Sequence, residues 1–393
     1  MLLGAFGDPG HAFPMIALGR ALVGRGHEVV LQTWTRWADD VRGLGMRFEA
    51  APEYHVFPTR ERPLKPYEAV ARATRSTRPL VAELRPDAVV ADILTLAPAL
   101  AAELEGVPVA TVIPHTDPRM EAGWPPYSLG ARLPRTPVGR AFWGAAARAT
   151  DAGLELGRRE LNETRARVGL GPLSYVHGGI SRALSLVATF PQIEYPRRSP
   201  LPATYVVGPL LWEPAAGDVE LPPGDGPLVM VAPSTSQDPD QRLMRAALLG
   251  LADLPVRVLA SLNRQPLPVS LPANARAVDW LSYARTMPSC DVVVCHGGHG
   301  TLARALASGC AVVIVPAAGD MNENAARVDW AGVGVRVPRR LCTPWAVRLA
   351  VERALSTPRL RARARELGAW ASEHDGAEAA AGLLEDFAVR HTN

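Results

Sequence analysis

The sequence predicts an α/β protein of two similar halves, each built around a parallel sheet. Short apolar runs typical of buried strands alternate with helical segments along the chain, which is the pattern of repeated βαβ units. At 393 residues the chain is longer than one hydrophobic core usually spans, so two domains are expected. Residues 209–227 are rich in proline, glycine and acidic residues, which is the composition of a linker between domains.

The first half alternates between strands and helices. Its first helix has Pro14 in the first turn and Gly24 and Gly26 at the end, which are the usual boundary residues of a helix. Residues 114–143 are irregular and aromatic, and residues 52–79 are assigned only as a loop that contains one helix. The predicted strands are 1–6, 29–33, 46–50, 86–92, 107–113, 184–189 and 205–207, and the predicted helices are 12–23, 41–45, 66–76, 97–104 and 154–168.

The second half repeats this organisation. Two of its strands, 292–295 and 311–315, are rich in valine and are expected to be buried on both faces of a sheet. The predicted strands are 228–232, 256–261, 275–278, 292–295, 311–315 and 334–337, and the predicted helices are 239–251, 302–307, 343–355, 358–372 and 377–390.

Composition argues against several classes of protein. With 42 basic and 39 acidic residues the net charge is +3, so neither nucleic acid nor an anionic membrane surface is indicated as a partner. No run of 18 apolar residues occurs, and no basic region precedes the first apolar run, so neither a membrane span nor a signal peptide is predicted. The four cysteines are scattered without a CxxC or Cys/His cluster. We therefore expect free buried thiols, no zinc site and a cytoplasmic location.

A glycine-rich turn, HGGHGT at 296–301, follows the strand 292–295 and opens a helix. Free backbone N–H groups and the positive end of a helix dipole then point at one place, which favours binding of phosphate. The strand 311–315 leads to a polar loop with Asp320, and both loops should face one crevice at the carboxyl edge of the sheet. A P-loop is excluded because Lys65 is the only lysine, and no dinucleotide fingerprint follows a strand.

Three motifs taken together resemble the donor-binding half of nucleotide-sugar glycosyltransferases with the two-domain GT-B fold. They are DWLSYA at 279–284, HGGHGT at 296–301 and GDMNENAARV at 319–328. The similarity is greatest to inverting enzymes that decorate antibiotics and plant secondary metabolites, and it is strongest over 278–336. It implies two Rossmann-like, doubly wound domains that face a cleft. Residues 1–208 would bind the acceptor, 209–227 would be the linker, 228–375 would bind the nucleotide sugar, and the C-terminal helix in 376–393 would pack back on the first domain.

The resemblance implies roles for residues on the donor side. Trp280 would stack on a uracil or thymine ring, although a tryptophan that caps a strand in the core is the alternative. His296 would bind the diphosphate, and Asp320 would accept hydrogen bonds from sugar hydroxyls. Met321 and Tyr283 stand where glutamines are usual, and Met321 has no useful hydrogen bond to offer a sugar. A dTDP-deoxysugar is therefore favoured over a UDP-sugar, which stays open. The other implied donor-binding residues are Ser234, Gly298, His299, Gly300 and Thr301.

The first half has a matching glycine-containing turn, GDPGH at 7–11. The resemblance implies that His11 is the general base that deprotonates the acceptor hydroxyl, and that Asp92 stabilises the imidazolium. A histidine at a helix N-terminus feels the positive end of the dipole, which should keep a neutral base available. Both residues could instead be helix caps, and His115 and Asp117 are rival partners for His11.

Aromatic residues fall where this family builds its acceptor pocket. Aromatic walls suit a flat or apolar acceptor, such as a polyketide or phenolic aglycone. The alternative is that they only hold a long loop in place. The candidate acceptor-binding residues are Tyr54, Phe57, Trp124, Tyr127, Phe142 and Trp143.

The predicted function is inverting transfer of a sugar from a nucleoside diphosphate sugar to a hydroxyl of a small-molecule acceptor in secondary-metabolite biosynthesis, without cofactor or metal. Asp238-Pro239-Asp240 is similar to a metal-binding Asp-x-Asp, but it lies at a predicted helix start, where acidic residues act as caps. Three alternatives stay open: an inactive nucleotide-binding auxiliary partner, a lipid-linked glycosyltransferase, and a sugar-nucleotide epimerase of the same fold. A dehydrogenase is disfavoured by the glycine spacing at 4–10. A homodimer is also left open.

Overall fold

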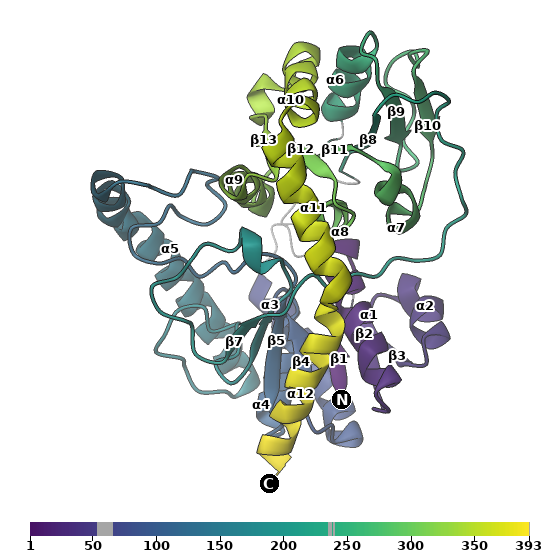
Figure 1. Cartoon of the computed structure of the whole chain (residues 1–393). Coiled ribbons are helices and arrows are strands. Elements are labelled where there is room, and N and C mark those ends of the chain that lie inside the picture. The colour runs from purple at the N-terminus through teal and green to yellow at the C-terminus, as the bar shows by residue number, and fades with distance from the viewer. Residues whose placement is uncertain (53–65, 235–237, 239, 393) are drawn as a thin grey trace.

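The computed structural model of the chain describes residues 1–52, 66–234, 238 and 240–392. Within these residues the strands form two separate parallel sheets, one of seven strands and one of six (Figure 1). The units around these sheets are called the first and the second domain below. The prediction of two α/β halves with parallel sheets is confirmed. No helix in the described part of the chain is long and apolar enough to cross a membrane.

The first sheet has the strand order β3-β2-β1-β4-β5-β6-β7. β1 (Leu2–Gly4) pairs on one side with β2 (Val30–Thr33) and on the other with β4 (Val89–Asp92). The strand order therefore reverses between β1 and β4, and the loops after these two strands border the crevice where ligands of such sheets bind. The remaining strands are β3 (Arg47–Ala50), β5 (Val109–Ile113), β6 (Ser185–Val187) and β7 (Thr204–Val206).

Helices cover both faces of this sheet because successive side chains of each strand point to opposite sides. Leu3 packs in the core that contains α1 (Pro9–Gly24), whereas Leu2 packs in the core that contains residues of α3 (Pro66–Leu84) and α4 (Leu96–Leu104). Both leucines are fully buried, which explains why the strand is apolar throughout instead of alternating. A short helix, α2 (Ala38–Gly43), links β2 to β3.

The main departure from the predicted elements is the helix α5. The sequence predicts a start at residue 154, but α5 extends over Pro137–Val168. Thr136 caps it by accepting the N–H of Gly139 at 3.1 Å, and Pro137 follows at the first helical position. The prediction of an irregular segment through residue 143 is therefore wrong at its end, because these two start signals lie inside the aromatic stretch. The first half of α5 projects from the first domain, and Phe142 is 63% exposed there (Figure 1).

The second sheet has the order β10-β9-β8-β11-β12-β13, with its reversal between β8 (Leu228–Ala232) and β11 (Val292–Cys295). Their carboxyl ends are in register, since Cys295 pairs with Ala232. The other strands are β9 (Arg257–Ser261), β10 (Ala275–Val278), β12 (Ala311–Ile314) and β13 (Gly334–Arg336). The helices are α6 (Arg242–Leu251), α7 (Tyr283–Thr286), α8 (His299–Ala307), α9 (Asp320–Ala331), α10 (Pro344–Ser356) and α11 (Pro358–Glu373).

Asp238, the first residue of the acidic triplet, caps a helix. The carboxylate of Asp238 accepts the N–H of Leu243 at 3.0 Å, in the first turn of α6. The helix begins at Arg242 instead of the predicted residue 239. In the described part of the chain no three His, Cys, Asp or Glu side chains are placed to hold a metal ion together.

The C-terminal helix α12 (Gly376–Thr392) runs from the second domain along the first (Figure 1). Leu384 and Phe387 are fully buried in the core that contains α1. The chain passes between the domains near Gly208 and again near Gly376, and these two passages touch. A Cβ on Gly376 would lie 2.7 Å from the carbonyl carbon of Gly208, so a larger residue would push the two passages apart.

Candidate active site

The reversal in the first sheet brings His11 and Asp92 together. His11 lies in the first turn of α1, which follows β1, and Asp92 is the last residue of the adjacent strand β4. The His11 Nδ1 atom lies 2.7 Å from the Asp92 Oδ1 atom. Because a carboxylate only accepts hydrogen bonds, Nδ1 carries the proton and Nε2 is left as the proton acceptor.

Asp92 is itself fixed in place. Its side chain is fully buried, and its second oxygen accepts from the Thr95 hydroxyl at 3.2 Å and from the Phe6 N–H at 3.4 Å. A histidine whose second nitrogen is oriented by a buried carboxylate has the geometry of a general base.

The pKa of His11 is raised above its ordinary value. Burial acts to lower it, but the charge and hydrogen bond of Asp92 act in the opposite direction and outweigh burial, with smaller contributions from Asp320 and Asp8. The helix dipole alone would disfavour the imidazolium, as the sequence predicts, but the carboxylate reverses the net shift. A base with a raised pKa has a larger driving force for taking a proton.

The rival partners of His11 are engaged elsewhere. Asp117 binds Arg119 through both carboxylate oxygens, at 2.9 and 2.7 Å, and burial, which would raise its pKa, is outweighed by this pairing, which lowers it. His115 donates from Nδ1 to the carbonyl of Thr116 at 2.8 Å, and the hydroxyl of Tyr127 lies 3.1 Å from the same nitrogen. The structure therefore assigns Asp92 to His11.

The glycine-rich turn connects β11 to α8. Gly297 has φ +87°, a conformation that favours glycine, and a Cβ on it would lie 2.9 Å from a methyl group of Ile314. Gly298 supports the ring of His296, since a Cβ there would lie 2.4 Å from Nε2 of that ring. Gly300 is exposed and has open space around it in the first turn of α8. The helix N-terminus is therefore accessible to an anion.

The two histidines of this turn point in different directions. His296 donates from Nδ1 toward the carbonyl of Ala232 at 3.4 Å, across the reversal in the second sheet. His299 instead reaches the first domain, where its Nε2 lies 3.3 Å from the carbonyl of Ala188. Burial lowers the pKa of His296, and burial with the neighbouring His115 lowers the pKa of His299 to about 4. Both rings are therefore neutral near pH 7, and Nε2 of His299 is taken up by the first domain.

Two further candidate donor-binding residues lie near this turn, and a third, Trp280, follows the edge strand β10 of the same sheet. Ser234 is buried directly after β8, and Thr301 lies in the first turn of α8. Trp280, just past β10, is 44% exposed, and the guanidinium carbon of Arg264 lies 5.9 Å from its ring centroid. A half-exposed indole outside the core fits a stacking surface better than a core cap. Arg264 has no motif that would have identified it from the sequence.

Asp320 links the two halves of the site. It is the first residue of α9, followed by Met321, whose backbone borders the glycine-rich turn at Gly297. Its charge acts on the pKa of His11 from the first domain and of His296 from the second, in each case after the larger effect of burial. The carboxylate therefore lies within electrostatic reach of both, at the carboxyl edge of the second sheet beyond β12.

The candidate acceptor residues are not all brought together. Trp124 contacts Tyr195 edge-on, with ring centroids 5.5 Å apart, and Tyr127 contacts His115. Phe142 and Trp143 contact each other on the projecting part of α5. The remaining two candidates, Tyr54 and Phe57, lie outside the described residues.

Trp34, which lies near His11 in the first domain, was not singled out by the sequence analysis. Its ring contacts Phe6 edge-on at 4.9 Å, and Phe6 in turn contacts the ring of His11 at 6.0 Å. A Cβ on Gly7 would lie 2.0 Å from the indole, so this glycine allows the close approach. Trp34 directly follows β2, at the same edge of the sheet as His11, and this position was the signal that could have found it.

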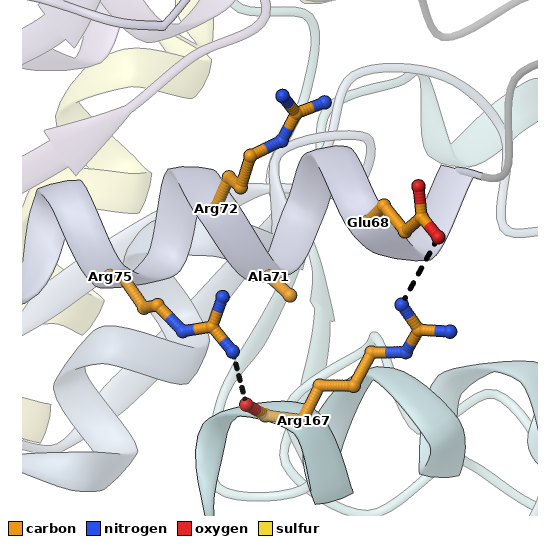
Figure 2. A pocket seen from close by; sticks show the side chains of 5 residues that line it. All are labelled: Glu68, Ala71, Arg72, Arg75 and Arg167. Atoms are coloured by element: carbon orange, nitrogen blue, oxygen red, sulfur yellow. Dashed lines mark hydrogen bonds and ion pairs between the residues drawn. The ribbon is translucent and has the colours of Figure 1, made fainter.

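A separate cavity of about 330 Å³ lies between α3 and the end of α5 (Figure 2). Arg75 donates to the carbonyl of Arg167 at 2.7 Å, and Arg167 lies 3.5 Å from the carboxylate of Glu68. Arg72 and Ala71 complete the lining. None of the residues predicted for catalysis or binding lines it.

Comparison with known proteins agrees with this architecture. Residues 246–385 match the sequence model of the family described as erythromycin biosynthesis protein CIII-like, C-terminal domain. The chain is 28% identical to 4'-demethylrebeccamycin synthase of Lentzea aerocolonigenes over 407 aligned residues, covering 96% of each protein. It is 33% identical to a PGL/p-HBAD biosynthesis glycosyltransferase of Mycobacterium tuberculosis over 42% of this chain and 40% of that protein.

Solved structures share the fold over the full length. The glycosyltransferase of kitacinnamycin superposes with a TM-score of 0.77 at 22% identity, covering 98% of both chains. VinC, solved in complex with dTDP, superposes with a TM-score of 0.71 at 20% identity, covering 99% of both. The two sheets and their facing loops therefore form a GT-B fold. The chain is a glycosyltransferase, similar to enzymes of the antibiotic-tailoring type.

Proposed function

We propose that the chain transfers a sugar, with inversion, from a nucleoside diphosphate sugar to a hydroxyl of an apolar or aromatic small molecule in secondary-metabolite biosynthesis. The observation that carries this proposal is the His11–Asp92 pair on one domain, with Asp320 and the glycine-rich turn opposite it on the other. With the base on one domain and the anion site on the other, an acceptor hydroxyl at the base can attack a sugar whose diphosphate is held at the anion site.

The reaction is a single displacement. Nε2 of His11 takes the proton of the acceptor hydroxyl while its oxygen attacks the anomeric carbon. The bond from that carbon to the diphosphate oxygen breaks, and its electron pair leaves with the diphosphate. Backbone N–H groups at the start of α8 and the helix dipole stabilise the charge that develops there. Asp92 stabilises the imidazolium at its Nδ1 atom.

The proposed donor is a dTDP-deoxysugar. Support comes from Met321, which follows Asp320 directly and has no side-chain hydrogen-bond donor, and from VinC, which was solved with dTDP. We expect Met321→Gln to raise the ratio of kcat/KM for UDP-glucose over a dTDP-deoxysugar, because the amide supplies a partner for an additional hydroxyl. Met120→Gln, in the first domain, is the matched control. A wild-type enzyme that prefers UDP-glucose would overturn this assignment of the donor.

Thermal unfolding with nucleotides tests the donor site directly. A ligand at about 100 times its Kd stabilises a protein by roughly 2.7 kcal/mol, a Tm shift of about 2–4 °C for domains of this size. We expect dTDP or UDP, but not NAD, to produce this shift, and Trp280→Ala to remove most of it. Trp345→Ala is the matched control, since Trp345 is 70% exposed on α10. If dTDP and UDP leave the wild-type Tm unchanged, the donor site is misassigned.

The complete function is tested by product analysis. We expect glycoside formation from dTDP- or UDP-sugars with a panel of planar phenolic and polyketide aglycones, with the anomeric configuration inverted. Turnover should be undiminished in EDTA, because the proposed stabilisation of the diphosphate comes from backbone groups. Nucleotide binding without transfer to any acceptor of the panel would favour the auxiliary-partner alternative.

A further inference from the structure

Arg327 is a fully buried charge at the contact between the two domains. It lies on α9, and its Nε atom is 2.9 Å from Glu323 Oε1, one turn earlier on the same helix. Its Nη1 atom is 2.6 Å from Glu194 Oε2, which belongs to the first domain. The side chain of Arg327 has no exposed surface and that of Glu194 is 12% exposed, so this ion pair is largely shielded from water and salt.

One aromatic ring packs against this ion pair, and two others pack against that ring. The guanidinium carbon lies 4.2 Å from the ring centroid of Tyr195, within the range of a cation–π interaction. Tyr195 also contacts Trp330 of α9 at 5.2 Å and Trp124 of the first domain at 5.5 Å. Charges enclosed in this way cost much desolvation energy, and apolar replacements of buried ion pairs are often as stable or more stable. Stability alone therefore does not account for an arginine here, whereas a need for fixed geometry does.

Arg327 and Glu194 are each connected to residues of the candidate active site in their own domain. On the second domain, α9 begins with Asp320, two turns before Arg327, and Asn324 donates to the carbonyl of Gly297 in the glycine-rich turn at 2.8 Å. On the first domain, the other oxygen of Glu194 accepts the N–H of Asp117 at 2.8 Å. Asp117 lies in the loop after β5 that also carries His115.

We infer that Arg327 is a positioning residue for sugar transfer. By fastening α9 to Glu194, it sets the separation between the sugar held near Asp320 and the base His11. This inference rests on the proposed function. Neither Arg327 nor Glu194 needs to touch a substrate for this role, since both act through the elements that carry the site.

Arg327→Lys tests the inference with the positive charge retained. A lysine ammonium is a single point charge and cannot reproduce the planar contacts to two carboxylates and a ring. We expect kcat for transfer to fall by about tenfold to a hundredfold, because a misplacement of roughly 1 Å costs on that order. The dTDP affinity should stay unchanged, since its proposed site lies within the second domain. Hydrolysis of the donor sugar by water should fall much less than transfer, because water needs no alignment with the acceptor site.

Glu194→Gln probes the same contact from the first domain and should give the same fall in the ratio of transfer to hydrolysis. The double variant should be little worse than either single variant, because both remove one interaction. Arg165→Lys is the matched control, since Arg165 is buried and pairs with both oxygens of Glu103 inside the first domain. It should lower the Tm without changing the ratio.

Two outcomes would overturn the inference. One is an unchanged kcat in both variants. The other is an equal fall of transfer and hydrolysis together with a lower Tm, which would show that Arg327 only supports the fold. Failure of the proposed function has a different signature: the wild-type protein itself would then neither bind dTDP or UDP nor transfer a sugar.

Discussion

Replacing His11 with alanine is expected to lower kcat for sugar transfer by about 10²- to 10⁴-fold, the usual contribution of a positioned general base. The reason is geometric: Asp92 fixes the proton on Nδ1, so Nε2 is the nitrogen left to accept a proton. Initial rates at saturating donor and acceptor measure the effect. The Tm shift with dTDP should persist, because His11 belongs to the domain opposite the glycine-rich turn.

His374→Ala is the matched control, since His374 is an exposed histidine at the end of α11. It should transfer sugar at the wild-type rate. If His11→Ala also does, another group removes the proton, and His115, which follows the strand β5 beside β4, becomes the first candidate. The pair of variants therefore separates a catalytic role of His11 from a capping role at the start of α1.

Asp92→Asn is expected to change the pH profile as well as the rate. The base must be neutral to act, so kcat/KM rises with pH through the pKa of His11. The Asp92 charge holds this pKa above its ordinary value against the effect of burial, which acts to lower it. Without the charge, burial dominates, and the rising limb should move to lower pH. The maximal rate should fall by up to about 10⁴-fold, as when the orienting carboxylate of a hydrolytic triad is removed.

The rival carboxylate offers the control for this experiment. Asp117 is held by Arg119, so Asp117→Asn should leave the position of the limb unchanged. If the rising limb of the pH profile shifts in Asp117→Asn but not in Asp92→Asn, the assignment of Asp92 as the partner of His11 is wrong. The measurement is kcat/KM against pH at constant ionic strength, because salt screens the charges that set the pKa.

The residues that could be placed from the sequence are those directly after strands. His11 follows β1 and Asp92 ends β4 beside the reversal in the first sheet, and His296 follows β11 beside the reversal in the second, so a correct order of elements already places each at the carboxyl edge of its sheet. The alternation of apolar runs and helices was enough for this, because parallel strands are buried on both faces. The domain limits at 208, 228 and 376 and the roles of these residues stay predictions.

Other features depend on contacts between distant segments and could not be read from local patterns. The His299 side chain turns to Ala188, 111 residues earlier in the chain, although its motif places it with the phosphate-binding turn. Arg327 looks like any charged residue on an amphipathic helix, and only the fold reveals that Glu194 covers it. The start of α5 was missed for a different reason, since an aromatic-rich stretch hides the Thr136 cap.

The contact between Gly208 and Gly376 has a mechanical consequence. The polypeptide passes between the domains twice. Both passages lie together at one place, so the two domains are connected at a single point. A rotation of one domain against the other would therefore turn about that place, and it would have to break the contact between Arg327 and Glu194. Because α12 completes the core around α1, the first domain cannot be isolated by a single cut after residue 208. A circularly permuted chain that begins at residue 376, joins residue 393 to residue 1 and ends at residue 208 would contain the whole first domain, including α12.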